Sequence, residues 1–120
     1  MTDLAETSLG ALVQMYRDHA AEHGRGTMVG NHILASDAYF HLSEVFRELR
    51  RRNGGALLSL LPLLDDENDW VRLWAAAHAL TFAPDKGEEI LTDLAASEDI
   101  VGFDAEMTLK MWRQGELEFP

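Results

Sequence analysis

The segment His19-Ala20-Ala21-Glu22-His23 is the part of the sequence whose residue types and spacing come closest to a catalytic motif. It has the H-x-x-E-H order of one class of zinc hydrolases, in which two His on a helix bind zinc and the Glu activates water. The segment lies directly before Gly24, in an expected last helical turn, where the helix dipole alone favours His. A zinc hydrolase using His19, Glu22 and His23 is therefore a remote alternative. Adventitious metal binding by His19 and His23, with His32 nearby, is favoured over catalysis.

Two groups of carboxylates form the second candidate site. The first group is Asp65, Asp66, Glu67 and Asp69, and the second is Glu88, Glu89 and Asp93. The first lacks the alternating ligands, the mid-loop Gly and the terminal Glu of a calcium-binding EF-hand. Helix capping and a solvated acidic edge explain it better. Trp70 comes directly after the first group. If Trp70 were exposed among these acids, it would anchor a basic partner, but packing under the preceding loop is favoured.

Other catalytic chemistry finds no support in the sequence. The chain has no Cys, which excludes thiol nucleophiles, Cys-ligated zinc, iron–sulfur clusters and disulfides. No Ser lies in a Gly-flanked nucleophile elbow. The segment Gly24-Arg25-Gly26 lacks the spacing and the Lys of a phosphate-binding loop. We therefore predict a protein that is not an enzyme and uses no cofactor.

The distribution of charge narrows the class of partner. The net charge is −11, and residues 54–120 hold 14 acidic and four basic residues, whereas residues 1–53 are almost balanced. Nucleic acids would be repelled, because their binding depends on Lys and Arg that neutralise phosphates. A basic protein would be attracted and steered towards the second half. Simple solubility explains the same acidity about as well, and both interpretations stay open.

The N-terminal residues and the apolar stretches predict where in the cell the protein lies. Asp3 and Glu6 stand where a secretory signal needs a basic start and an apolar run. The longest uncharged stretches, 53–64 and 73–84, are shorter than the roughly 18 residues that a membrane-spanning helix needs. We expect a cytoplasmic protein without membrane contact.

Hydrophobic periodicity and Gly/Pro positions predict six helices. Their ranges are 4–23, 27–52, 56–64, 70–82, 85–96 and 103–114. Gly24-Arg25-Gly26 is expected to end the first helix and Asn53-Gly54-Gly55 the second, and Asp85 with Glu88 to form a capping box at the fifth. The second helix is apolar on two sides and is expected to pack between neighbours. Asn31, early in that helix, is expected to fix the first hairpin, a role favoured over ligand binding.

The second half of the chain contains an internal repeat. Leu60, Leu61 and Leu64 match Ile90, Leu91 and Leu94 at an offset of 30 in the numbering. At an offset of 32, a second set of residues matches. Val71, Ala75, Ala79 and Leu80 correspond, in this order, to Phe103, Met107, Met111 and Trp112. A period of this size with two helices per unit is typical of an alpha-solenoid. The segment 60–80, with its Asp/Asn turn, Val71-Arg72 and small Ala residues, resembles a HEAT repeat.

Nearly the whole chain resembles one uncharacterised bacterial family, the domain of unknown function numbered two-thousand-nineteen. The matching features, in order, are Asn31, Glu48-Leu49-Arg50-Arg51-Arg52, Ala56-Leu57-Leu58, Val71-Arg72 with Ala75-Ala76, Ala83-Pro84, and Leu109, Trp112 and Gly115. The resemblance implies a compact ARM/HEAT-like bundle and no particular activity. Such small helical domains also resemble bacterial immunity proteins in size and character, which is an analogy.

We therefore predict an all-α fold, a compact alpha-alpha superhelix of about three ARM/HEAT-like hairpins. It forms a single domain over residues 1–115, with a short frayed tail at 116–120. The predicted function is a non-enzymatic protein-interaction module, in its most concrete form an immunity- or antitoxin-like protein that masks a basic partner. Its predicted binding residues are Asp65, Asp66, Glu67, Asp69, Trp70, Glu88, Glu89 and Asp93. A self-associating structural domain, closed as a homodimer, is the alternative.

Overall fold

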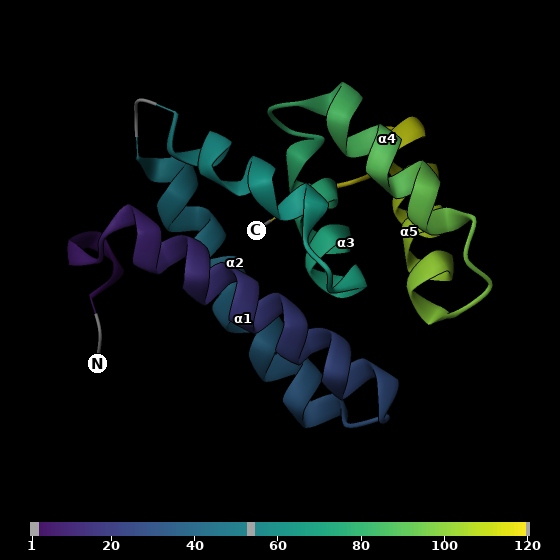
Figure 1. Cartoon of the computed structure of the whole chain (residues 1–120), viewed down its shortest axis with the longest axis horizontal. Helices are drawn as coiled ribbons and strands as arrows, with labels where there is room; N and C mark the ends of the chain where they lie inside the picture. The colour runs from purple at the N-terminus through teal and green to yellow at the C-terminus, as the bar shows by residue number, and fades with distance from the viewer. Residues whose placement is uncertain (1–2, 53–54, 120) are drawn as a thin grey trace. The chain divides into compact units, whose positions relative to one another are not determined.

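Helices follow one another along the described chain of this computed structural model, which covers residues 3–52 and 55–119. The α-helices are α1 (Leu9–Met28), α2 (His32–Arg51), α3 (Asp69–Ala79), α4 (Pro84–Ala95) and α5 (Ile100–Arg113) (Figure 1). Two 3-10 helices, η1 (Leu4–Glu6) and η2 (Ala56–Asp65), precede α1 and α3. The described residues contain no strand, so the prediction of an all-α fold is confirmed. The predicted turn at Asn53 and Gly54 lies outside them. None of the described helices is long and apolar enough to span a membrane.

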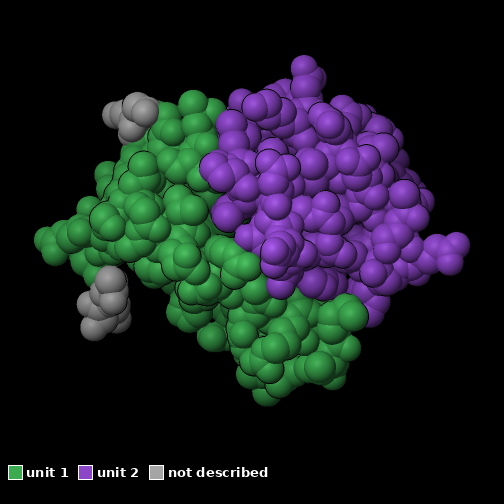
Figure 2. Space-filling view, viewed as in Figure 1, with its two compact units in different colours: residues 1–60, 120 green, residues 61–119 purple. Residues whose placement is uncertain are grey.

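The chain divides into two compact units (Figure 2). The first runs to Leu60 and contains η1, α1 and α2, and the second runs from Leu61 to Phe119 and contains α3, α4 and α5. The boundary falls inside η2, a 3-10 helix that contains Pro62. Pro lacks the backbone N–H that an α-helix interior requires, in agreement with the irregular bonding there. One domain over residues 1–115 stays a prediction.

The first unit is an α1–α2 hairpin in which the two helices lie side by side (Figure 1). The Ser8 hydroxyl caps α1 by accepting from the Ala11 N–H at 3.2 Å. The inner stripe of α1 is buried at Leu12, Tyr16 and Ala20. The facing stripe of α2 is buried at Ala38, Leu42, Val45 and Leu49. Spacings of three and four therefore identify most of the core of this hairpin, although Ala5 and Leu9, at the start of the same predicted stripe, are exposed.

Helix α1 continues through Gly24-Arg25-Gly26, so the prediction that these residues end it is wrong. A Cβ on Gly26 would lie 2.8 Å from the backbone nitrogen of Ala35, so the glycine is there because α2 approaches closely. The turn comes at Gly30, whose φ of 72° suits glycine best. Close packing, rather than helix termination, explains Gly26.

Asn31 is the N-cap of α2. Its side-chain oxygen accepts from the Leu34 N–H at 3.0 Å, and its own N–H donates to the Gly26 carbonyl at 2.8 Å. Asn31 therefore joins the two helices of the hairpin, as expected of a structural residue. The second apolar stripe of α2 differs from the prediction. Ile33, Tyr39 and Phe40 are exposed, whereas Phe46 of the same stripe is buried, so the stripe is covered only towards the C-terminal end of α2.

In the second unit, α3 packs on α4 and α4 packs on α5. Asn68 caps α3 and Asp99 caps α5, each by accepting a backbone N–H of the first turn. Helix α4 begins with Pro84 at its first position, and no side chain caps it. The predicted capping box of Asp85 and Glu88 is therefore wrong.

Several buried positions of α3 recur in α5 at an offset of 30. Val71 and Ala75 of α3 are buried, and so are Val101 and Ala105 of α5. Phe103, Met107 and Met111 are exposed, so the predicted pairing of α3 with α5 at an offset of 32 is wrong. The large side chains of α5 mislead the sequence comparison, because its buried face uses smaller residues.

The C-terminal tail includes an ordered contact. The Phe119 ring lies 4.7 Å from the buried His78 ring of α3, in an edge-to-face arrangement. Aromatic edges and faces attract at this separation. The expectation of a frayed tail therefore does not hold for Phe119, which contacts α3.

Candidate functional site

One face of α4 is acidic along its length. Asp85, Glu88, Glu89 and Asp93 line a shallow open groove of about 340 Å³ together with Thr92. Asp85 is three residues before Glu88 and four before Glu89, and Glu89 is four before Asp93, so these carboxylates share one broad helix face. The opposite face, with Gly87, Leu91 and Leu94, is buried. Core packing therefore holds α4 in place and presents its carboxylates to solvent.

A small pocket adjoins this acidic face. It has a volume of about 230 Å³ and is lined by Leu61, Leu64 and Ile90 as apolar residues and by Asp65, Lys86 and Glu89 as charged ones. Glu89 lines both the pocket and the groove. The pocket thus brings Asp65, from the end of η2, next to the second predicted group of acids. We name Asp65, Asp85, Glu88, Glu89 and Asp93 the acidic face.

The remaining acids of the 65–69 turn serve the start of α3. The Asp66 side chain accepts from the Asn68 N–H at 2.9 Å, and Asp69 forms an ion pair with Arg72. Glu67 is exposed. Trp70 is 7% exposed, so packing is its role and an accessible anchor for a partner is excluded in this structure. Among the predicted residues of this turn, Asp65 is the one that lines the pocket beside α4.

Glu88 differs from its neighbours on the acidic face because it has an internal partner. Its carboxylate accepts from Arg113 of α5, with the nearest atoms 2.9 Å apart. Both side chains are largely exposed, and pairs of this kind contribute little to stability. Asp65, Asp85, Glu89 and Asp93 are exposed, and they are the more accessible charges.

The H-x-x-E-H residues do not assemble around a common point. Glu22 forms an ion pair with Arg25 of the next turn, and His19 stacks on His41 of α2 with 5.3 Å between ring centroids. His23 lies beside Tyr39, with ring centroids 6.5 Å apart. Across the described residues, no three His, Asp or Glu side chains are arranged to hold a metal ion. The geometry gives the zinc interpretation no support.

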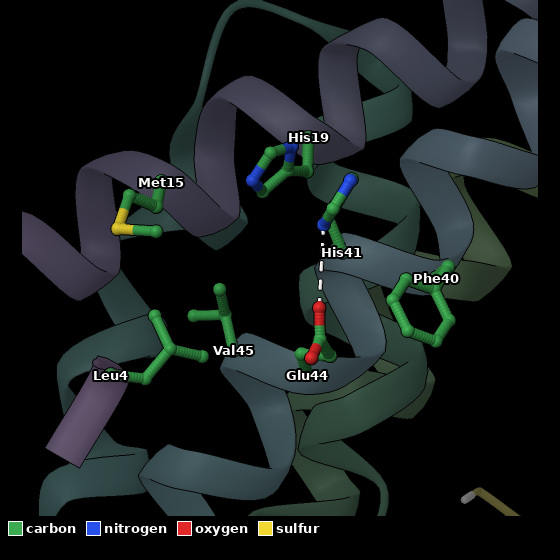
Figure 3. A pocket seen from close by; sticks show the side chains of 7 residues that line it. All are labelled: Leu4, Met15, His19, Phe40, His41, Glu44 and Val45. Carbon is green, nitrogen blue, oxygen red and sulfur yellow. Dashed lines mark hydrogen bonds and ion pairs between the residues drawn. The ribbon is translucent and has the colours of Figure 1, made fainter. Parts of the chain in front are cut away.

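The stacked histidines instead border a cavity of about 500 Å³ in the first unit. Figure 3 shows Leu4, Met15 and Val45 on one side of this cavity and His19, His41 and Glu44 on the other. His41 is 3.3 Å from Glu44 and 3.5 Å from Asp37, between nitrogen and oxygen atoms. Phe40 also lines the cavity.

Two histidines of this hairpin are expected to make the stability of the chain depend on pH. Burial, and then the neighbouring His41, lower the pKa of His19 below its usual value, and burial lowers the pKa of His23. Both are therefore neutral in the folded chain at a pH where the unfolded chain, with a His pKa of about 6.5, already binds protons. The free energy of unfolding should fall as the pH is lowered from 7.5 to 5.5, measured by urea denaturation.

The matched variants of this experiment replace histidines with glutamine. His19→Gln with His23→Gln should flatten the pH dependence, because glutamine does not titrate. His32→Gln, at an exposed position at the start of α2, should leave the dependence unchanged. An equally steep loss of stability in the double variant would show that other groups cause it.

Some residues at these sites have no separate signal in the sequence. Asp85 could be found, because it precedes Glu89 and Asp93 on one helix face, but its place at the start of α4 favours interpretation as a cap. Lys86 and Ile90 can be assigned to the pocket only when the position of α4 relative to the end of η2 is known. His41 and Glu44 lie beside His19 because of the register between α1 and α2, and helical periodicity does not predict that register.

The chain was compared with known proteins. No curated protein matches it. It is similar to the protein RPA1889 from Rhodopseudomonas palustris CGA009, whose crystal structure aligns over 100% of both chains with 26% sequence identity and a TM-score of 0.90. The model of a domain of unknown function, DUF2019, matches residues 10–112. The order of motifs from Asn31 to Gly115 predicts this family, and the match covers most of both compact units. The chain therefore belongs to the DUF2019 family.

Proposed function

We propose that this chain is a non-enzymatic interaction module that binds a basic protein through the acidic face. The observation that supports the proposal best is the pocket beside α4, where Asp65 and Glu89 accompany apolar residues. An acidic surface kept for solubility alone needs no such apolar hollow. Attraction between this face and a cationic surface would speed their encounter and orient it.

The pocket has the chemistry to accept one Lys or Arg side chain. The methylene groups of such a side chain would lie on Leu61, Leu64 and Ile90, while its charge stays between Asp65 and Glu89. Lys86 also lines the pocket and opposes a second cation. Its presence gives the proposal a sharp test, because removing Lys86 should strengthen binding, whereas removing the acids should weaken it.

The finer form of the proposal concerns the fold and the biological role. The burial pattern that α3 and α5 share at one offset supports a HEAT-like pair of repeats in the second unit. A small acidic helical domain of this kind suits a cytoplasmic immunity- or antitoxin-like protein that masks a basic toxin, for example a nuclease. Neither an enzymatic activity nor a cofactor is needed for this role.

The proposal can be tested with a fluorescently labelled oligolysine peptide as the basic probe. Its dissociation constant is measured by anisotropy at ionic strengths of about 0.01 M and 0.15 M, where the screening length falls from about 30 to 8 Å. The variant Asp65→Asn, Glu89→Gln, Asp93→Asn should weaken binding about tenfold at the lower ionic strength. Lys86→Gln should strengthen it about twofold or more.

A matched control separates the acidic face from net charge. The variant Glu6→Gln, Asp18→Asn, Asp37→Asn changes the net charge by the same amount at exposed positions of the first unit. It should leave binding nearly unchanged. Equal weakening by the two triple variants would mean that the probe responds to total charge, and the proposed site would be wrong.

A further inference from the structure

Helix α5 carries a stripe of large apolar side chains on its solvent side. Ile100, Phe103, Met107 and Met111 follow one another at spacings of three and four, and their exposed fractions are 44, 61, 38 and 38%. These residues therefore form one continuous helix face. Contiguous apolar surface of this kind is a mark of interaction sites, whereas single exposed apolar residues are not. We name these four residues the α5 stripe.

The equivalent face of α3 is covered within the chain. At the repeat offset, Trp70, Leu73 and Ala77 correspond to Ile100, Phe103 and Met107, and they are exposed by only 7, 5 and 5%. Other positions match in burial, because Val71, Ala75 and Ala79 are buried and so are their equivalents Val101, Ala105 and Leu109. The α5 stripe is thus the face of a helical repeat that lacks its cover, whereas terminal repeats usually end a stack with a polar outer face.

We infer that the cover is a second copy of this chain, which pairs its α5 with the first in antiparallel orientation. Charge along α5 supports this choice of occupant. Asp99, Asp104 and Glu106 lie towards the N-terminal end of the helix, whereas Lys110 and Arg113 lie at the C-terminal end. An antiparallel pair brings each acidic end beside the basic end of the other copy, and a parallel pair would oppose like charges.

The register of the pair follows from the stripe. If Phe103 of one copy lies opposite Met107 of the other, then Ile100 lies within one residue of the position opposite Met111, and the stripe covers itself about a twofold axis. The same register places Lys110 within one residue of the position opposite Asp99 of the other copy, and both residues are exposed. Such an isologous contact, in which residue i meets j and j meets i, is the usual form of a homodimer interface.

Sedimentation velocity on the full chain over a range of concentrations tests the dimer. The wild type should approach twice the chain mass of 13.4 kDa as concentration rises. Phe103→Glu with Met107→Glu should raise the dissociation constant by at least about tenfold, since each 1.4 kcal/mol of lost burial is one factor of ten. Ile33→Glu, at an 85% exposed apolar residue of the other unit, should still dimerise.

Engineered cysteines test the orientation, because the chain has no cysteine of its own. Mixed and oxidised, the single variants Phe103→Cys and Met107→Cys should form the disulfide between 103 and 107 in preference to either symmetric one. Preferred 103–103 and 107–107 links would indicate a parallel pair and overturn the proposed register. A wild type that stays monomeric at every concentration, or a double Glu variant that dimerises equally well, would overturn the interface.

The dependence on salt distinguishes dimerisation through the α5 stripe from binding of a basic protein by the acidic face. Apolar contact is not screened, and added salt reduces the repulsion between two chains that each carry a net charge of −11. Dimerisation should therefore persist or strengthen at the higher ionic strength, at which binding of oligolysine weakens. The Phe103→Glu, Met107→Glu variant should still bind oligolysine, so failure of either idea leaves the other testable.

Discussion

Replacing Gly87 with alanine is expected to lower the free energy of unfolding by about 1–3 kcal/mol, the usual cost of overpacking. Gly87 is buried where α4 meets α3, and a Cβ there would lie 2.6 Å from the Ala76 oxygen and 3.0 Å from the Leu80 nitrogen. Both neighbours are backbone atoms, so no side-chain rotation can relieve the contact. The two helices must separate, and Leu91 and Leu94 lose part of their packing.

Gly10→Ala is the matched control. Gly10 lies in the first turn of α1, and a Cβ added to it would meet nothing within 4 Å, so alanine fits there without a clash. Because alanine favours helix by about 1 kcal/mol over glycine, this change should be neutral or stabilising. Urea denaturation of both variants measures the difference. If Gly87→Ala proved as stable as Gly10→Ala, the close approach of α3 and α4 would be contradicted.

Replacing Arg52 with alanine is expected to lower the free energy of unfolding by about 1–3 kcal/mol, because several charged hydrogen bonds are lost together. The Arg52 guanidinium donates to the Thr7 carbonyl at 2.6 Å, to the Leu4 carbonyl at 2.9 Å and to Glu48 at 2.8 Å. Glu48 is buried and also accepts from Arg51. Arg52 therefore fastens η1 to the end of α2.

The same substitution should have a local readout. Without Arg52, the backbone N–H groups of residues 4–8 should exchange with deuterium faster, because η1 loses its attachment. Arg47→Ala, at an exposed arginine of the same helix, removes the same charge without any of these bonds. It should change neither exchange nor stability appreciably. Equal exchange in the two variants would show that η1 is held by other contacts.

Local signals in the sequence predict much of this fold. The buried stripes of α1 and α2 follow from helical periodicity, and Asn68 follows from the preference for Asn at N-caps. Gly26 is misinterpreted, because a glycine that ends a helix and a glycine that lets two helices touch look the same in one dimension. Only the position of Ala35 on the neighbouring helix distinguishes them.

Tertiary register explains the remaining errors. The sequence comparison pairs Phe103 and Met107 with Val71 and Ala75, but the core side of α5 uses Ala105 and Leu109 instead. Likewise, the link between Asp65 and Glu89 depends on where the end of η2 lies beside α4. Neither composition nor periodicity gives the position of η2 relative to α4, so the sequence predicts the candidate site as two separate groups of acids.

The central claim, that the acidic face binds a basic protein, is tested most directly by affinity capture from cells that produce this protein. The baits are the wild type and the Asp65→Asn, Glu89→Gln, Asp93→Asn variant, each at low and at high salt, with mass spectrometry of what is retained. We predict a basic protein that the wild type captures at low salt and loses at high salt, and that the variant does not capture. Equal capture of that protein by both baits, or recovery of no basic protein by the wild type, would contradict the claim.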